Sequence, residues 1–344
     1  MIRLTWRQFQ AGALVALAAL AALGAVLGAT GSGMADDYTR GLAAAGGNCN
    51  DPISQCREFR EAFWQEHQYG FLGTILLLLL LPALIGLFWG APLITRELET
   101  RTLWLIWNQS ITRNRWLAVK LTVVGLAGMA VAGIAALLVN WWTSPLDKTD
   151  TVDWPRMGPL MFPTRGLAVI GYAAFAFALG VVVGMLVKRT LPAMAITLLV
   201  FAAVQIAMPM LVRPNYQAPV SESMTYTMDN VDDLGLSESG EMHMSTKPPE
   251  AGSWVLVNRT VDSAGNPVGD FIQLPAEAMA GPCGREAKME DCVAEVNRLG
   301  YRQELVYQPI GRFWTFQWIE FGIFFGLALA LGAFSFWWVR KRLV

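Results

Sequence analysis

Six long apolar runs constrain the fold of this chain more than any other feature of its sequence. Each run is close to the ~20 residues that an α-helix needs to cross the ~30 Å hydrocarbon core of a bilayer. None of them contains Asp, Glu, Lys or Arg, and they cover residues 11–29, 71–91, 121–142, 166–187, 191–212 and 321–339. Charged residues make up 15% of the chain, against roughly 25% in soluble domains. The sequence therefore predicts an all-α polytopic membrane protein with six transmembrane helices in a lipid bilayer.

The first run could also be a cleavable signal peptide, because Arg3 and Arg7 precede it. The apolar part of a signal peptide has about 7–15 residues, and the run over residues 11–29 is longer. We therefore expect it to be retained as a span.

The basic residues predict the orientation, because cytoplasmic connections of membrane proteins are enriched in Lys and Arg. If the N-terminus is cytoplasmic, that side holds 12 basic residues, and the two shorter outer loops hold six. The acidic residues are distributed still more unevenly, since Glu97 and Glu99 are the only two of 27 on the cytoplasmic side. We expect a multi-pass protein with both termini in the cytoplasm.

The four cysteines agree with this orientation. Cys49 and Cys56 fall in the first outer loop, and Cys283 and Cys292 fall in the long outer segment after the fifth run. Disulfides persist in oxidising compartments outside the cytoplasm. Four cysteines allow three pairings, of which we expect the local pairs Cys49–Cys56 and Cys283–Cys292; free thiols are the alternative.

The predicted spans divide the chain into seven segments. They are the N-terminus with the first span (1–29), an outer loop with a disulfide (30–70), the second span (71–91), a cytoplasmic elbow (92–120), the third to fifth spans (121–212), an extracytoplasmic domain (213–312) and the sixth span with a basic cytoplasmic tail (313–344). In the outer loop, Phe59, Phe63 and Trp64 recur at roughly helical spacing. This pattern predicts a short amphipathic helix on the outer surface that leads into the second span.

The extracytoplasmic domain is predicted to be a small α+β unit stapled by one disulfide. Its first part, residues 217–252, is polar, acidic and interrupted by Pro and Gly, which is typical of a loop. Residues 253–274 predict two strands around a Ser-Ala-Gly-Asn turn. A helix that ends at Gly300 and a last strand in "QELVYQP" complete the predicted domain.

The chain lacks the sequence motifs of nucleoside triphosphatases and of the common hydrolases. A P-loop requires a Gly-Lys dipeptide, which occurs nowhere in the chain, and H-E-x-x-H and G-x-S-x-G are absent as well. His67 and His243 lie in separate outer segments, too few for an ordinary zinc site. The sequence "EMHMS" around His243 is a weak candidate for a Cu(I) site. We expect no catalytic residue, no resident metal or cofactor and no nucleic-acid partner.

Glu320 is the ionisable residue nearest to a predicted span interior. Counted back from Arg340 it lies ~30 Å along the helix, beside Trp314 and Trp318, which fit an aromatic belt at the outer boundary. We interpret Glu320 as an interfacial residue; the alternative is an outer gate made by Glu320 and Gln317. Because ionisable groups inside the bilayer mark ion pathways, their absence from the six runs predicts an apolar or amphipathic substrate.

The elbow between the second and third spans combines charge with tryptophan. Glu97 and Arg101 stand four residues apart with the acid first, the favourable order for a pair on a helix. Leu103, Trp104 and Trp107 then fall on one face of a short helix suited to an interface. The alternative is that the basic residues here serve only to fix the orientation.

The elbow sequence "LITRELETRTLWLIWNQSITRNRWLAVKL" resembles the cytoplasmic loop after the second span of type-2 ATP-binding-cassette (ABC) exporter permeases. That loop has an Arg/Glu pair, a Gly-Thr-Leu-Glu-like turn, a short apolar helix and a Ser-x-x-Arg stretch that ends in Lys. The matching positions here are Arg96, Glu97, Glu99, Thr102, Leu103, Ser110, Arg113 and Lys120. Arg101 stands where the family often has Gly, which leaves the register of the coupling helix open. "FWGAPLITRELE" and "YQPIGRFWTFQWIE" also resemble a bacterial subgroup with an enlarged ectodomain between spans five and six.

The resemblance implies the transport subunit of an exporter in a bacterial plasma membrane. A second permease copy would complete a homodimer or heterodimer, and two cytoplasmic ABC ATPase subunits would bind ATP and Mg. The elbow would carry force from the ATPases to the first, second and fifth spans. Its coupling residues would be Arg96, Glu97, Glu99, Arg101, Thr102, Leu103, Trp104, Trp107 and Arg113. Small residues such as Gly86 and the Gly180/Gly184 pair would let helices pack closely.

A different function class remains as the alternative to the exporter. In that class the chain is a membrane sensor or scaffold whose ectodomain binds an outer ligand. It predicts ligand binding by residues 213–312 alone, and function without an ATPase. For an exporter, the uncharged spans favour a drug, an antibiotic, a lipid or a hydrophobic peptide as cargo.

Overall fold

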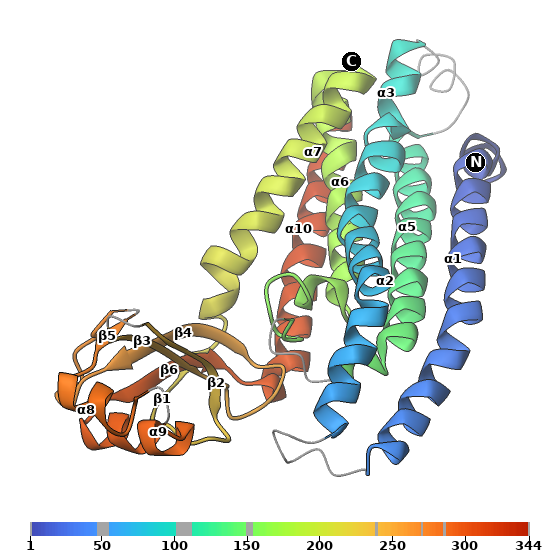
Figure 1. The fold of residues 1–344 in the computed structure, drawn as a ribbon. Coiled ribbons are helices and arrows are strands. Elements are labelled where there is room, and N and C mark those ends of the chain that lie inside the picture. Colours follow the sequence, from blue (N-terminus) through green and yellow to red (C-terminus); the bar gives the residue numbers. More distant parts are fainter. Residues whose placement is uncertain are drawn as a thin grey trace.

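The computed structural model describes residues 2–46, 55–100, 112–148, 154–237, 240–269, 271–284 and 287–342. A bundle of long helices stands beside a small β-domain (Figure 1). The start of α1, helix α3 and the end of α10 lie at one end of the bundle, here called the terminal end. The β-domain lies at the opposite end, here called the sheet end.

Six helical segments of the described chain are long and apolar enough to cross a membrane, which confirms the predicted number. They cover Trp6–Ala44, Glu58–Glu99, Arg113–Thr143, Ala168–Val187, Thr190–Asn215 and Ile310–Lys341. Their main helices are α1 (Ile2–Ala44), α2 (Gln55–Ile85), α5 (Arg113–Thr143), α6 (Ala168–Val187), α7 (Thr190–Ala207) and α10 (Phe313–Lys341).

The first two helices are longer than the apolar runs that predicted them. Helix α1 has 43 residues, about 64 Å at 1.5 Å per residue, so it continues through residues 30–44, which were expected to form a loop. Residues 55–70 likewise belong to α2 itself and not to a separate surface helix. Tyr38 of α1 packs between Phe59 and Phe63 of α2, and a Cβ at Gly41 would overlap the Phe59 ring. This packing overrides the low helix propensity of the glycines.

Helix α6 is the centre of the bundle and is buried along nearly its whole length. Against it lies a π-helical turn, η1 (Gly86–Gly90), which follows α2 and leads into α3 (Pro92–Glu99). A Cβ at Gly180 of α6 would come within 2.4 Å of the Gly86 carbonyl oxygen, and one at Gly184 within 2.7 Å of the Ala91 carbonyl oxygen. The backbones therefore touch, as the G-x-x-x-G spacing of Gly180 and Gly184 suggested.

Short turns connect the long helices at the sheet end. Around the loop between α5 and α6 they are η2 (Leu146–Lys148) and η3 (Phe162–Thr164). Helix α7 ends in a π turn, η4 (Met208–Val212), and then η5 (Arg213–Asn215), while η6 (Ile310–Arg312) precedes α10.

The β-domain contains two three-stranded antiparallel sheets. One has the order β1-β6-β4, formed by Val220–Met224, Arg302–Gln308 and Trp254–Val261, with Leu305 of β6 opposite Glu222 and Asn258. The other has the order β2-β3-β5, formed by Val231–Leu236, Glu241–Thr246 and Ile272–Gln273. Two helices, α8 (Ala276–Ala280) and α9 (Met289–Arg298), complete the domain.

Several predictions for this domain are confirmed and others are wrong. Helix α9, the positive φ of Gly300 and the last strand, β6, are as expected. The segment expected to be a loop instead supplies β1, whose partner β6 is distant in sequence, and the local hairpin of β2 and β3. Strand β4 exists and pairs mainly with β6. Only its end meets the residues after the turn, through a bridge between Val261 and Pro267, and the strand that follows, β5, pairs with β3. Met242 and Met244 point into the domain core, which explains the alternating methionines as packing.

The cysteines follow the expected local pattern where the structure describes them. Cys283 and Cys292 form a disulfide that ties the end of α8 to α9. Cys56 is buried and disulfide-bonded, while Cys49 lies outside the described residues.

Candidate functional sites at the two ends of the bundle

At the terminal end, Glu97 of α3 points into the bundle. Its Oε1 accepts hydrogen bonds from Lys120 Nζ of α5 and, at 3.1 Å, from Gln8 Nε2 of α1. The Lys120 ammonium also lies 3.4 Å from the Leu93 carbonyl oxygen and 5.0 Å from the centre of the Trp116 ring. Glu97 and Lys120 are 6% and 4% exposed, so a buried ion pair joins three helices here.

The two oxygens of the Glu97 carboxylate differ in their contacts. Its Oε2 is buried and has no hydrogen-bond partner among the described residues. A buried carboxylate oxygen without a donor is costly, and among the described residues this end leaves one such oxygen.

Glu99, two residues further along α3, holds the start of α7. Its Oε1 accepts from the Thr190 backbone N–H at 2.8 Å, and its Oε2 accepts from the Thr190 hydroxyl at 2.9 Å. Thr95, which is fully buried, places its hydroxyl 2.9 Å from the same Thr190 hydroxyl. Glu99 thus acts as a helix N-cap supplied by a different segment, and α3 contacts α1, α5 and α7 through side-chain hydrogen bonds.

The other predicted coupling residues are placed less fully. Arg96 is exposed on α3, and Arg113 is the first residue of α5, directly after the N-cap Thr112. Arg101, Thr102, Leu103, Trp104 and Trp107 lie outside the described residues, so the predicted Glu97–Arg101 pair and the interfacial face stay predictions.

At the sheet end, Glu320 is fully buried within the protein; its position at the membrane boundary stays a prediction. Arg213 donates to both of its oxygens, from Nε at 2.9 Å and from Nη2 at 2.8 Å. The Tyr172 hydroxyl donates to Oε1, and the Tyr216 hydroxyl donates to Oε2 at 3.1 Å. Burial, followed by the Glu320 charge, raises the pKa of Tyr216, which therefore remains a donor. Glu320 receives four hydrogen bonds from three residues, which belong to α6 and to the turn after α7.

Arg213 links this cluster to the β-domain. Its guanidinium carbon lies 4.4 Å from the ring centre of Phe162 and 6.0 Å from that of Trp254 on β4. Nearby, Gln308 at the end of β6 donates to the carbonyl oxygens of Pro214 at 3.0 Å and Gln217 at 2.8 Å. The end of α7 is therefore joined to both α10 and the sheet β1-β6-β4.

Gln317, one turn before Glu320, brackets the start of α6. Its Oε1 accepts from the Ala168 backbone N–H at 2.8 Å, and its Nε2 donates to the Phe162 carbonyl oxygen at 2.9 Å. Both polar atoms of its side-chain amide are thus hydrogen-bonded to backbone, so Gln317 fixes α10 against the turn that leads into α6.

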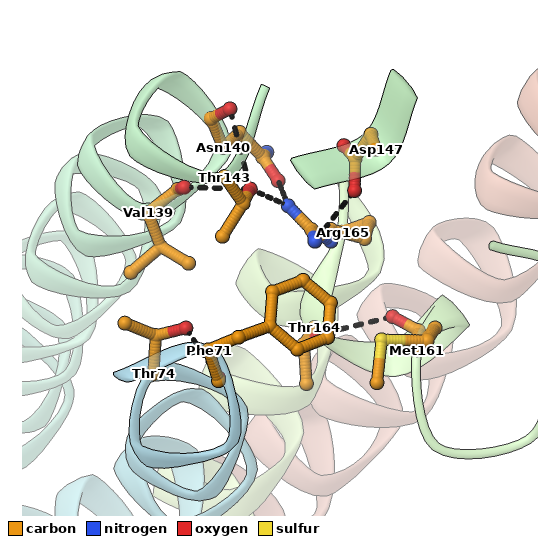
Figure 2. Close-up of polar contacts among 9 residues, drawn as sticks. All are labelled: Phe71, Thr74, Val139, Asn140, Thr143, Asp147, Met161, Thr164 and Arg165. Atoms are coloured by element: carbon orange, nitrogen blue, oxygen red, sulfur yellow. Dashed lines mark hydrogen bonds and ion pairs between the residues drawn. The ribbon is translucent and has the colours of Figure 1, made fainter. Parts of the chain in front are cut away.

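A third buried charge, Arg165, was not singled out in the sequence. Figure 2 shows its guanidinium between the end of α5 and the following turn. Nη1 donates to the Thr143 hydroxyl and to Asn140 Oδ1 at 3.3 Å, and Nη2 donates to Asp147 Oδ1 at 3.0 Å. Burial lowers the pKa of Arg165 and raises the pKa of Asp147, and their mutual attraction acts against both shifts.

A model of the family described as ABC-2 membrane transporter related matches residues 17–213, more than half of the chain. The chain belongs to this family. The match confirms the resemblance to type-2 ABC permeases at the level of the family, and it indicates the membrane subunit of a transporter. No curated protein and no solved structure matches the chain.

The matched region of this ABC-2 membrane transporter relative begins within the first span and covers the second to fifth spans and the whole elbow, with Glu97, Glu99 and Lys120. It ends at Arg213, so the β-domain and Glu320 lie beyond it. Within the described residues, no group of three or more His, Cys, Asp or Glu side chains could hold a metal ion. The buried charges of the two ends hold helices together.

The sequence analysis did not identify the ion-pair partners of Glu320 and Glu97, although their positions at the ends of the apolar runs offered a signal. Arg213 directly follows the fifth apolar run and Glu320 directly precedes the sixth. Opposite charges at neighbouring ends of two adjacent spans are natural candidates for a pair. For Lys120, which directly precedes the third run, the same reasoning would have suggested a partner on α3.

Proposed function

We propose that the chain is the transmembrane permease subunit of an ABC exporter that moves an apolar or amphipathic substrate outward. Drugs, antibiotics, lipids and hydrophobic peptides are the substrate classes that suit its uncharged span interiors. The observation that carries this proposal is the family match, which includes the elbow. The enlarged ectodomain between spans five and six marks the proposed bacterial subgroup.

In this proposal the terminal end faces the cytoplasm and carries two ABC ATPase subunits, which bind the ATP and Mg that this chain does not. A second permease copy, identical or homologous, completes the transport path. Helices α1 and α7 leave most of their apolar surface uncovered, in contrast to α6. This surface is available to lipid and to the second permease copy.

The proposed coupling runs through α3. An ATPase that presses on the elbow displaces α3, whose hydrogen bonds to Gln8, Lys120 and Thr190 transmit the displacement to α1, α5 and α7. Helix α7 packs along a narrow stripe of Ala193, Thr197 and Phe201. Such a stripe permits the helix to shift as a body, with its start held by α3.

The test uses the full chain, co-expressed with a candidate ABC ATPase and purified from membranes through a tag on the permease. A variant with Trp104→Ala and Trp107→Ala should lose the ATPase from the complex. Trp141→Ala, a matched change of an exposed tryptophan at the sheet end, should retain it. In inside-out vesicles, ATP-dependent uptake of a fluorescent apolar dye should follow the same pattern.

The exporter proposal is wrong if no ABC ATPase co-purifies with the wild-type chain, or if the elbow variant keeps full ATP-dependent transport. Ligand binding by the β-domain with normal cellular function in the absence of any ATPase would favour the sensor or scaffold.

A further inference from the structure

A partly open cavity of about 180 Å³ lies where the bundle meets the β-domain. Its walls include Trp64 and Phe71 of α2, Asp147 after α5, Trp154 and Arg156 before α6, and Gly252 before β4. Phe71 is the first residue of an apolar run, and Asp147 follows the end of another by five residues. The cavity therefore lies at the boundary of the apolar part of the bundle, where lipid headgroups are found.

Three aromatic side chains give the cavity its apolar surface. Trp64 and Phe71 are in edge-to-face contact with their ring centres 5.0 Å apart, and Trp154 contributes a second indole. Aromatic faces attract alkylammonium groups, and tryptophan is the residue that most often occupies the headgroup level of a membrane. The lining is suited to a polar group that carries short methylene segments.

The cavity wall also carries both a carboxylate and a guanidinium. Asp147 is 31% exposed and accepts one hydrogen bond from Arg165. Burial raises its pKa even though Arg165 and Arg156 act in the opposite direction, and a further cation beside the carboxylate would favour its charged form. The Arg156 guanidinium is held 4.5 Å from the centre of the Phe313 ring, and a held side chain loses less entropy when it binds an anion.

We propose that this cavity binds the headgroup of a phosphatidylethanolamine molecule from the surrounding bilayer. Its phosphate contacts Arg156, and its ammonium contacts Asp147 beside the faces of Trp64 and Trp154. The volume corresponds to about six water molecules at ~30 Å³ each, room for an ethanolamine phosphate. Phosphatidylglycerol offers no ammonium, and phosphatidylcholine offers no N–H donor to the carboxylate. The inference concerns a lipid site and does not depend on the proposed transport function.

Native mass spectrometry of the full chain in detergent tests this site. The wild type, given equal amounts of phosphatidylethanolamine and phosphatidylglycerol, should retain one phosphatidylethanolamine in preference. Asp147→Asn and Arg156→Gln should each weaken this binding about tenfold, in line with the loss of a charge-assisted hydrogen bond. Asp291→Asn and Arg302→Gln, which change exposed residues of the β-domain, are the matched controls and should bind like wild type.

Trp154→Leu serves as a further variant, because it leaves the Asp147–Arg165 pair in place. It should also lose the lipid while its thermal unfolding stays close to that of the wild type. Equal retention of phosphatidylglycerol by the wild type would overturn the proposed recognition of the ammonium. Undiminished phosphatidylethanolamine binding by all three cavity variants would overturn the site itself.

Discussion

The two buried ion pairs at opposite ends of the bundle are built differently. At the sheet end, Glu320 receives four hydrogen bonds, and both of its oxygens are used. At the terminal end, only one oxygen of Glu97 has partners among the described residues. Neither network is complete among the described residues, because Arg213 Nη1 at the sheet end is also buried without a hydrogen-bond partner. The two carboxylates therefore differ in the number of donors that each receives.

From this difference we expect the sheet end to be more rigid than the terminal end. The sheet end unites α6, α7, α10 and the β-domain around one carboxylate, so these parts move together. The terminal end joins α3 to α1, α5 and α7 and includes part of the elbow, where the proposed ATPase acts. A transporter needs both a rigid part and a part that changes shape.

The largest expected effect comes from Arg213→Ala, because it leaves the Glu320 carboxylate buried without its cation. Breaking a buried pair in this way destabilises a protein by about 3–5 kcal/mol. Thermal unfolding in detergent should therefore shift strongly. Tyr172→Phe, which removes one hydrogen bond and keeps the pair, should cost only about 1–2 kcal/mol. Equal effects of the two variants would contradict the view that the ion pair organises this end.

A smaller effect is expected from the pair at the terminal end. Glu97→Gln leaves Lys120 without its counter-charge, but a lysine near a helix end can extend to the membrane surface. We expect a loss of about 1–3 kcal/mol. The double variant Glu97→Leu with Lys120→Met should recover most of this loss, since apolar replacement of a whole buried pair is often neutral. If Glu97→Gln destabilises as much as Arg213→Ala, the two ends do not differ as proposed.

The smallest effect is expected at Glu99, which is exposed and caps α7 from outside. Glu99→Ala should raise hydrogen exchange of the first backbone amides of α7 roughly a few-fold, because the Thr190 N–H loses its acceptor. Glu99→Gln keeps an acceptor oxygen and is the matched control. If hydrogen exchange also increases around Tyr216, at the far end of α7, the two ends of the bundle are coupled and do not behave independently.

The sequence predicted the features that depend on local pattern. Uncharged apolar runs located six spans, and the local spacing of Cys283 and Cys292 suggested their disulfide, which is present. The contacts that organise the bundle are non-local: Arg213 and Glu320 are 107 positions apart, with the β-domain between them. The predicted apolar runs exclude every charged residue. Charged residues that are buried in ion pairs, such as Arg213 and Glu320, were therefore placed just outside the predicted spans.

The β-domain shows the same limit in another form. Strand β1 reads as a polar loop because its only described partner, β6, follows some eighty residues later. The sequence did predict β6, whose alternating residues carry the signal of a half-buried strand. Strand β1 forms because it pairs with β6, and its own residues show no such alternation.

The close glycine contact between η1 and α6 has a consequence for the second span as a whole. Because η1 is fixed against α6, it can act as a pivot: a sideways displacement of the helix on one side of it moves the helix on the other side in the opposite direction. Here the shorter side is α3 with Glu97 and Glu99, and the longer side is α2, whose Trp64 and Phe71 line the cavity beside the β-domain. A push on α3 would then be felt at that cavity, across the full thickness of the membrane.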